Sequence, residues 1–184
     1  MINGFFMSVG KHRNSQEFVR NDLVNEPKII ILIPEYPEQY TRIMSYLEKI
    51  RAHGRDANPF FCLMGIEVVQ IEPGKAVLKM AVRRDMQNSV SWLQGGVLVA
   101  LADEAMALAL YPLLAENEGI ATISESTSFI KGVREGVICA EGRVVRKGRR
   151  VAFMEGDVRM VDEAHTILSR TSAAFAVTTN TRKN

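Results

Sequence analysis

The sequence predicts an α+β domain in which one long central helix is wrapped by an antiparallel sheet of about six strands. Residues from 94 to about 114 are apolar on nearly every face, which is typical of a buried helix. The segments on both sides alternate between apolar and polar side chains and are separated by turn residues, which is typical of antiparallel strands. We predict that this domain covers residues 58–184 and that residues 1–57 form an N-terminal extension.

The extension is expected to contain one helix. Residues 1–36 show no clear period and are predicted to be partly irregular, with Lys28–Ile33 as a short strand or docking segment. Residues 38–53 carry apolar side chains at three- and four-residue spacings, which predicts an amphipathic helix that packs on another element. The linker from His53 to Pro59 ends it. The apolar positions are Tyr40, Ile43, Met44, Leu47 and Ile50.

The strands of the main domain are predicted on both sides of the long helix. After a short apolar turn at Phe60, a hairpin is expected, with strands near 67–71 and 77–83 joined by the turn Glu72–Lys75. After the helix, glycine and charged turn residues separate further alternating segments. These four strands are expected near residues 120–131, 136–147, 150–161 and 166–178.

Composition places the chain among ordinary globular proteins. It has 184 residues, of which 47% are hydrophobic and 24% charged. The net charge of +2 is too small to predict a nucleic-acid partner. Two cysteines fit reduced thiols, so we expect a cytoplasmic location. The apolar run near 95–115 carries Asp103 and Glu104, so no membrane span is expected. No His or Cys pair has metal-ligand spacing, so no metal is expected either.

The central helix carries the strongest functional signal. It begins at Gly95 and Gly96, where backbone N–H groups and the helix dipole would favour an anion or a developing oxyanion. Asp103 and Glu104 are carboxylates in apolar surroundings, which must find partners or change their pKa. Being adjacent, they point about 100° apart and are not expected to face one site. Asp103 lies two turns beyond the glycines, so we expect it to be the working acid; a structural role for both features remains the alternative.

Basic and aromatic side chains provide further candidates. Trp92 is expected to line a pocket or to pack in an interface. Several basic residues could bind the phosphates of a ligand, because guanidinium groups match phosphate geometry, but a solvated hairpin tip would explain their positions equally well. The candidate phosphate-binding residues are Lys131, Arg134, Arg146, Lys147, Arg149 and Arg150.

The helix start resembles a known family. Hot-dog fold thioesterases of the phenylacetyl-CoA thioesterase group typically read Asn, five residues, His-Gly-Gly, six residues, and Asp or Glu. In this sequence Asn88, Gln94, Gly95-Gly96 and Asp103 occupy those positions. The resemblance covers about residues 58–177, continues through Thr122 and the basic turn 146–150, and departs at Gln94, where the family usually has histidine.

The resemblance implies the hot-dog fold and hydrolysis of an acyl-CoA thioester, with coenzyme A as part of the substrate and no other cofactor. A glycine N–H at the helix start would polarise the thioester carbonyl, and Asp103 of a second chain would activate water or attack directly. Asn88, Gln94 and Thr122 would orient carbonyl and water. Because a sheet wrapped on one helix leaves an exposed edge and half a site, we expect a homodimer at least, with a tetramer left open.

Gln94 keeps other interpretations open. Glutamine can donate a hydrogen bond, but it cannot carry a proton between pH 5 and 8 as histidine can. The leading alternative is therefore a non-catalytic acyl-CoA or fatty-acyl binding protein of the same fold. A dehydratase is a weaker alternative because its His and Asp pair is not visible, and one helix in residues 1–57 disfavours a helix-turn-helix regulator.

Overall fold

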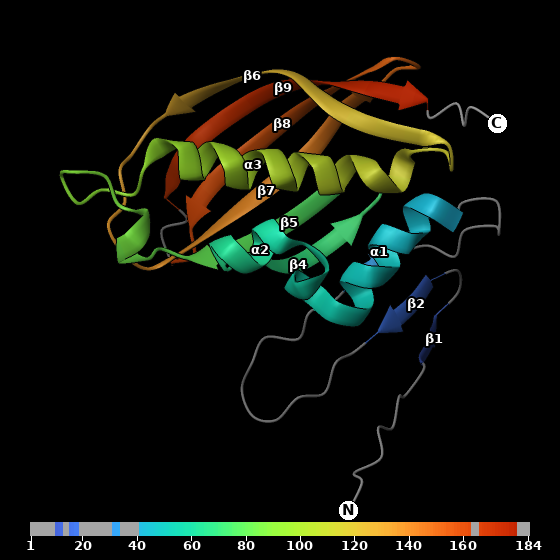
Figure 1. Ribbon diagram of the computed structural model, residues 1–184, viewed down its shortest axis with the longest axis horizontal. Helices are drawn as coiled ribbons and strands as arrows, with labels where there is room; N and C mark the ends of the chain where they lie inside the picture. The colour runs from blue at the N-terminus through green and yellow to red at the C-terminus, as the bar shows by residue number, and fades with distance from the viewer. Residues whose placement is uncertain (1–9, 13–14, 19–30, 34–40, 163–165, 180–184) are drawn as a thin grey trace, which may run out of the picture.

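The main domain is a curved six-stranded antiparallel sheet that encloses one long helix (Figure 1). The computed structural model describes residues 10–12, 15–18, 31–33, 41–162 and 166–179, with side chains from residue 46 onward. The strand order is β4-β5-β7-β8-β9-β6, so β4 and β6 are the two edges. The strands are β4 (Glu67–Glu72), β5 (Lys75–Ala81), β6 (Glu118–Phe129), β7 (Val137–Lys147), β8 (Val151–Met160) and β9 (Ile167–Thr179).

This architecture confirms the predicted fold class. All six predicted strands are present, each within about three residues of its expected bounds. The turn residues account for the connections: Gly74 has a positive φ of 87° in the β4–β5 turn, a conformation that glycine adopts without steric cost. A further helix, α2 (Pro59–Met64), occupies the segment predicted as an apolar turn. Asn58 caps its N-terminus by accepting a hydrogen bond from the Phe60 N–H at 2.9 Å.

The central helix α3 spans Gly95–Leu110 and continues into a short 3₁₀ turn, η4 (Tyr111–Leu113). Its stretch Gly95–Leu113 is long and apolar enough to fit a membrane span by composition, and half of that apolar stretch is buried inside the domain. The helix side chains on the sheet side stabilise the fold by about 25 cal/mol for each Å² of apolar surface that is removed from water. These fully buried residues are Leu101, Ala102, Ala105, Met106, Leu108, Ala109 and Leu110.

Two glycines let the helix approach the sheet closely. Gly142 of β7 and Gly156 of β8 are register partners under the middle of α3. A Cβ at Gly142 would clash with the backbone of Ala105 and Met106. At Gly156 a Cβ would meet the flexible Met106 side chain at 3.3 Å. Gly142 therefore determines how near α3 lies to the strands.

The extension contains α1 (Thr41–His53) and a 3₁₀ turn, η2 (Gly54–Ala57), which lie beside the β4 end of the domain (Figure 1). The predicted amphipathic helix is confirmed over residues 41–53; its predicted first residues, 38–40, lie outside the described part. Leu47 and Ile50 are buried, as their spacing predicts. The short strand predicted within 28–33 is present as β3 (Ile31–Ile33). It belongs to a three-stranded antiparallel sheet with β1 (Gly10–His12) and β2 (Ser15–Phe18), and these two strands were not predicted.

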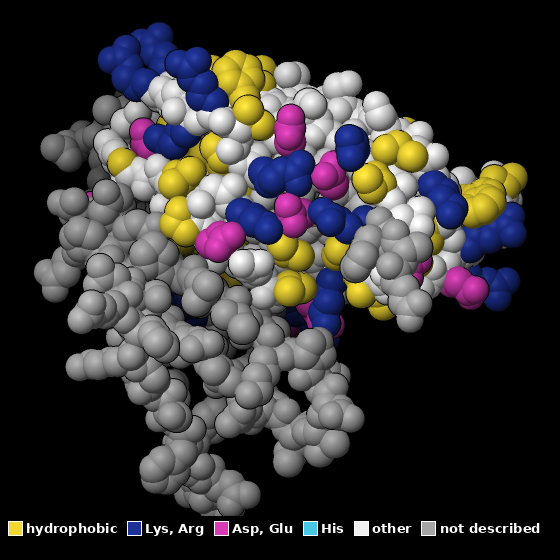
Figure 2. All heavy atoms as spheres, turned by 180° about the vertical axis from the view of Figure 1, so that it is seen from behind, with side chains coloured by type: hydrophobic (Ala, Val, Ile, Leu, Met, Phe, Trp, Pro, Cys, Tyr) yellow, Lys and Arg dark blue, Asp and Glu magenta, His cyan; other side chains and the backbone are white. Residues whose placement is uncertain are grey.

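The outer face of the main sheet carries paired charges. Figure 2 shows basic and acidic side chains interspersed over this face. Arg143 contacts Glu141 at 3.0 Å, Asp157 at 3.2 Å and Glu155 at 3.6 Å, all on β7 and β8. Alternation along each strand thus places apolar side chains against α3 and charged ones outside.

Candidate active site

The start of α3 presents unoccupied backbone donors. Gln94 is the N-cap residue, with φ −61° and ψ 131°, and its side chain does not cap the helix. The first N–H groups of an α-helix have no intrahelical acceptor, and among the described residues those of Gly95 and Gly96 have no other partner. A Cβ at Gly96 would meet nothing within 4 Å, so open space adjoins this residue, whereas a Cβ at Gly95 would meet the Phe129 ring at 3.1 Å. The geometry suits binding of a carbonyl oxygen or an anion.

Asn88 shapes the loop before the helix. Its Oδ1 accepts hydrogen bonds from the backbone N–H groups of Val90 and Trp92, each at 3.0 Å. Its own N–H donates to the Trp92 carbonyl at 2.7 Å. The tight loop also holds Ser91 at a positive φ of 62°. Asn88 was predicted to orient substrate; in the structure its side-chain oxygen is engaged within the loop, and its amide N–H₂ is the group left to meet a ligand.

Asp103 lies on the open side of α3 and is held by the adjacent strand. The Thr122 hydroxyl on β6 donates a hydrogen bond to Asp103 Oδ1 at 3.1 Å. Burial raises the pKa of Asp103 above its ordinary value, and the Thr122 hydrogen bond opposes this shift. The second oxygen has no partner among the described residues and is free to accept a proton from water. The structure therefore brings together two predicted site residues, Asp103 and Thr122.

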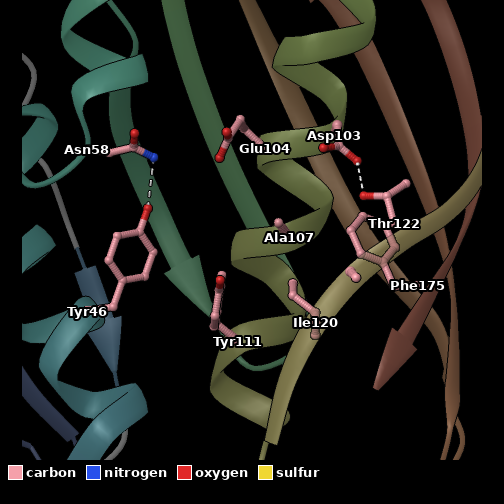
Figure 3. A pocket seen from close by; sticks show the side chains of 10 residues that line it. Tyr46, Asn58, Asp103, Glu104, Ala107, Tyr111, Ile120, Thr122 and Phe175 are labelled. Carbon is pink, nitrogen blue, oxygen red and sulfur yellow. Dashed lines mark hydrogen bonds between the residues drawn. The ribbon is translucent and has the colours of Figure 1, made fainter. Parts of the chain in front are cut away.

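A cavity of about 230 Å³ adjoins this pair (Figure 3). Asp103 and Thr122 form one side of it, and Ala107, Ile120 and Phe175 provide apolar lining. The opposite side is polar, and sequence reasoning missed it. Its members come from α1, the cap of α2, α3 and η4: Tyr46, Asn58, Glu104 and Tyr111.

Glu104 borders the same cavity as Asp103, contrary to our expectation that two adjacent helical carboxylates would not share a site. The two side chains do point in different directions, as expected: Figure 3 shows Asp103 directed toward Thr122 and Glu104 toward Asn58 and Tyr111. The expectation failed because the cavity extends across the helix, from β6 to the N-terminal extension. No local sequence signal shows where α1 docks, so the breadth of the cavity was not predictable.

The polar side of the cavity perturbs its titratable groups. Burial, and secondarily the nearby Asp103 carboxylate, raise the pKa of Glu104 to about 7. Burial raises the pKa of Tyr46 to about 12, and that of Tyr111 is also raised. Both phenols therefore stay protonated at neutral pH and remain hydrogen-bond donors. Perturbed groups that converge on one cavity are typical of functional sites.

The raised pKa of Glu104 predicts a pH-dependent stability. The folded protein holds the Glu104 proton more tightly than the unfolded chain, so stability falls as pH rises from about 4.5 to 7 and the loss is complete above that range. Between pH 5 and pH 8 the free energy of unfolding should fall less in Glu104→Gln than in the parent. The difference between the two proteins is expected to be ~1–2 kcal/mol, allowing for solvent screening. Urea denaturation at both pH values and one protein concentration measures it.

The exposed Glu135→Gln is the matched control for this measurement, because it removes the same charge from the surface. Its change in stability between pH 5 and pH 8 should equal that of the parent. An equal pH dependence for the parent and Glu104→Gln would contradict the assignment of a buried, proton-holding Glu104.

The predicted basic residues fall into two separate groups. Lys131 and Arg134 are exposed beside the start of α3, where the Arg134 guanidinium lies 4.1 Å from the centre of the Trp92 ring. Trp92 itself is 38% exposed. The turn after β7 holds the other group, at the far end of an eleven-residue strand that spans roughly 33 Å. Within one chain the two groups therefore do not share a site.

The turn group comprises Arg146, Lys147, Arg149 and Arg150. Lys147 is engaged in an ion pair with Glu118 of β6 at 3.1 Å, whereas the three arginines are exposed. No group of three His, Cys, Asp or Glu side chains suited to a metal ion occurs among the described residues. In the described part of the chain, the cavity and the helix start are thus the positions where the geometry favours chemistry.

One helix enclosed by a curved antiparallel sheet, with a Gly-Gly start and an acid on its open side, defines a hot-dog fold protein. Residues 93–178, a little under half of the chain, match the family model of the thioesterase superfamily. The match begins one residue before Gln94 and ends within β9, so it covers α3 and the four strands after it.

Individual proteins show the same likeness. The chain is 25% identical over 114 residues to 1,4-dihydroxy-2-naphthoyl-CoA hydrolase of Listeria monocytogenes, a match that covers 62% of this chain and 91% of that protein. A Haemophilus influenzae thioesterase shares the fold with a TM-score of 0.63 and 22% identity, over 69% of this chain and 88% of that one. A mutant of the phenylacetic acid degradation protein PaaI of Thermus thermophilus aligns with a TM-score of 0.59 and 24% identity, over 65% of this chain and 98% of that one.

Proposed function

We propose that this protein hydrolyses acyl-CoA thioesters to a free acid and coenzyme A, at a site formed between two chains. The observation that carries the proposal is Asp103, a half-buried carboxylate held by Thr122 on the open side of α3, beyond a helix start with free N–H groups. The match of residues 93–178 to the thioesterase superfamily model supports the reaction class. The name of the Listeria relative, a hydrolase of a CoA thioester, supports coenzyme A as the thiol.

The dimensions of α3 favour a second chain in the site. Asp103 follows Gly95 and Gly96 by eight and seven residues, which places them about 11 Å apart along the helix axis. A carbonyl polarised by a glycine N–H lies about 3 Å from that nitrogen, so Asp103 of the same chain is too distant to serve it. A second copy that aligns its α3 with the first would bring its Asp103 to the glycine N–H groups.

The edge strand β6 supports such pairing. It ends the sheet, and most of its residues are exposed, with Ile123 at 58% and Phe129 at 59%. An edge strand this long, with apolar side chains exposed, is a surface that proteins normally cover. A second copy paired along β6 would cover it and close the open side of both cavities. We therefore propose a homodimer as the smallest active form.

The proposed mechanism assigns the charges to named groups. The N–H of Gly95 or Gly96 donates to the thioester oxygen and stabilises the negative charge that develops there. Asp103 of the partner chain takes a proton from water, whose oxygen attacks the carbonyl carbon; direct attack by its carboxylate is the alternative. The C–S bond then breaks and coenzyme A leaves as a thiolate that takes up a proton. Arg134, whose guanidinium lies 4.1 Å from the centre of the Trp92 ring, and Lys131 are proposed to contact its phosphates.

A thiol-release assay across short, long and aromatic acyl-CoAs tests this proposal, with Gln94→His measured beside the parent. We expect hydrolysis by the parent protein of at least one acyl class. The exposed Gln94 side chain adjoins the helix start, and a histidine there can donate a stronger, charge-assisted hydrogen bond. The variant is therefore expected to raise kcat by up to about tenfold. No thiol release by either protein would reject the enzyme.

The alternative is an acyl-CoA binding protein without turnover. It is favoured by Gln94, whose amide cannot transfer a proton at neutral pH. Calorimetric titration with the same acyl-CoAs distinguishes the two functions. Tight binding without thiol release would identify the binding protein, whereas binding with release would identify the thioesterase.

A further inference from the structure

The polar side of the cavity is built by a part of the chain outside the matched residues 93–178. Tyr46 comes from α1 and Asn58 from the cap of α2. Asn58 Nδ2 donates a hydrogen bond to the Tyr46 hydroxyl oxygen at 3.1 Å, while its Oδ1 accepts from the Phe60 N–H. The Tyr46 ring packs against that of Tyr111, with centroids 5.3 Å apart. The extension thus holds the Tyr46 hydroxyl at the cavity in a defined position.

The hydrogen bonds leave a donor and an acceptor available on this side. Because the Tyr46 oxygen accepts from Asn58, its own O–H proton remains to be donated. Glu104 lies across from it and has no hydrogen-bond or ion-pair partner among the described residues. The donor of Tyr46 and the acceptor of Glu104 face one space (Figure 3). A ligand group that both accepts and donates a hydrogen bond would satisfy the two together.

The charges of the cavity narrow the chemistry of that group. Two carboxyl side chains, of Asp103 and Glu104, line it, and no lysine or arginine does so among the described residues. An anionic acyl terminus would be repelled by the carboxylates. An ammonium group could donate to Glu104, but it has no lone pair to accept from Tyr46. A neutral hydroxyl group fits both, and burying it without partners would be unfavourable.

We propose that helix α1 belongs to the substrate site and that Tyr46, positioned by Asn58, makes the enzyme specific for acyl groups that carry a hydroxyl. The inference rests on the proposed thioesterase function. The hydroxyl accepts from the Tyr46 O–H and donates to the Glu104 carboxyl. The cavity of about 230 Å³, which is open on one side, would hold the hydroxyl end of the acyl group.

Matched pairs of acyl-CoAs that differ only in a hydroxyl test the proposal: ω-hydroxyhexanoyl-CoA against hexanoyl-CoA, and para-hydroxyphenylacetyl-CoA against phenylacetyl-CoA. We expect the parent protein to favour the hydroxyl member of at least one pair in kcat/KM by about 30-fold or more, because a site built to hydrogen-bond a hydroxyl rejects the analogue that lacks it. Tyr46→Phe should lower that preference about tenfold, mainly through KM, because the contact forms already in the bound substrate.

Tyr46→Phe retains the ring that packs on Tyr111, so the fold should be preserved, and a thermal melt checks this. The exposed Lys49→Ala on the same helix is the matched control and should keep the parent preference. Equal kcat/KM values within both pairs, or an unchanged preference in Tyr46→Phe, would overturn the proposal while leaving the thioesterase intact.

If the parent protein releases no thiol, the proposed reaction fails and binding still tests the hydroxyl site. Calorimetric titration with analogues in which a methylene group replaces the thioester sulfur measures the affinity for each member of a pair. Tighter binding of the hydroxyl analogue that is lost in Tyr46→Phe supports the site, and equal affinities reject it.

Discussion

Asp103→Asn is expected to lower kcat for acyl-CoA hydrolysis by about 10²–10⁴-fold, the usual contribution of a positioned general base. Asparagine keeps the size of the side chain and can still accept the 3.1 Å hydrogen bond from Thr122, so the fold should be retained. It has no carboxylate to take a proton from water. KM should change little, because the proton is transferred only in the transition state. Steady-state thiol release on the best acyl-CoA measures both constants.

The exposed Asp162→Asn is the control for Asp103→Asn, because it makes the same chemical change away from the cavity. It should keep parent activity. Asp103→Asn protein that retains half or more of the parent kcat would show that another group activates the water. In the parent, the fall of kcat/KM toward acid pH should occur above the ordinary pKa of aspartate, because burial raises the pKa of Asp103.

Gly142→Ala is expected to destabilise the protein by ~3 kcal/mol or more, at the upper end of the cost of overpacking. The new methyl group would clash with the backbone of Ala105 and Met106, and backbone in the middle of a helix has no other rotamer to adopt. Helix α3 must therefore move away from β7, which opens the core. For a chain of this length the melting temperature should fall by about 6–12 °C. Differential scanning calorimetry measures the shift.

Gly156→Ala is the matched control for Gly142→Ala, since the two glycines are register partners on neighbouring strands. At Gly156 the added methyl group meets the Met106 side chain at 3.3 Å, and methionine can change rotamer. The expected destabilisation is below ~1.5 kcal/mol. Equal destabilisation by the two substitutions would show that the close approach of α3 to β7 does not limit packing.

The local pattern of the chain was enough to predict the architecture of the main domain. Alternation along each strand and the turn residues between them reflect steric preferences within a few residues, so they can be read without the fold. The same holds for Gly95-Gly96 at the helix start, whereas the hydrogen bond between Asp103 and Thr122 was seen only in the structure.

Tertiary packing determined the rest of the site. Tyr46 and Glu104 lie 58 residues apart in sequence, and they share a cavity because α1 docks beside α3. The basic side chains of 146–150 lie at the opposite end of β7 from Lys131, which their composition alone did not show. Such arrangements depend on contacts between distant segments, whose free energy is not encoded in any local period. The sequence by itself thus determined the fold, the helix start and Asp103, whereas only the three-dimensional structure revealed the cavity's polar side and its contribution from the N-terminal extension.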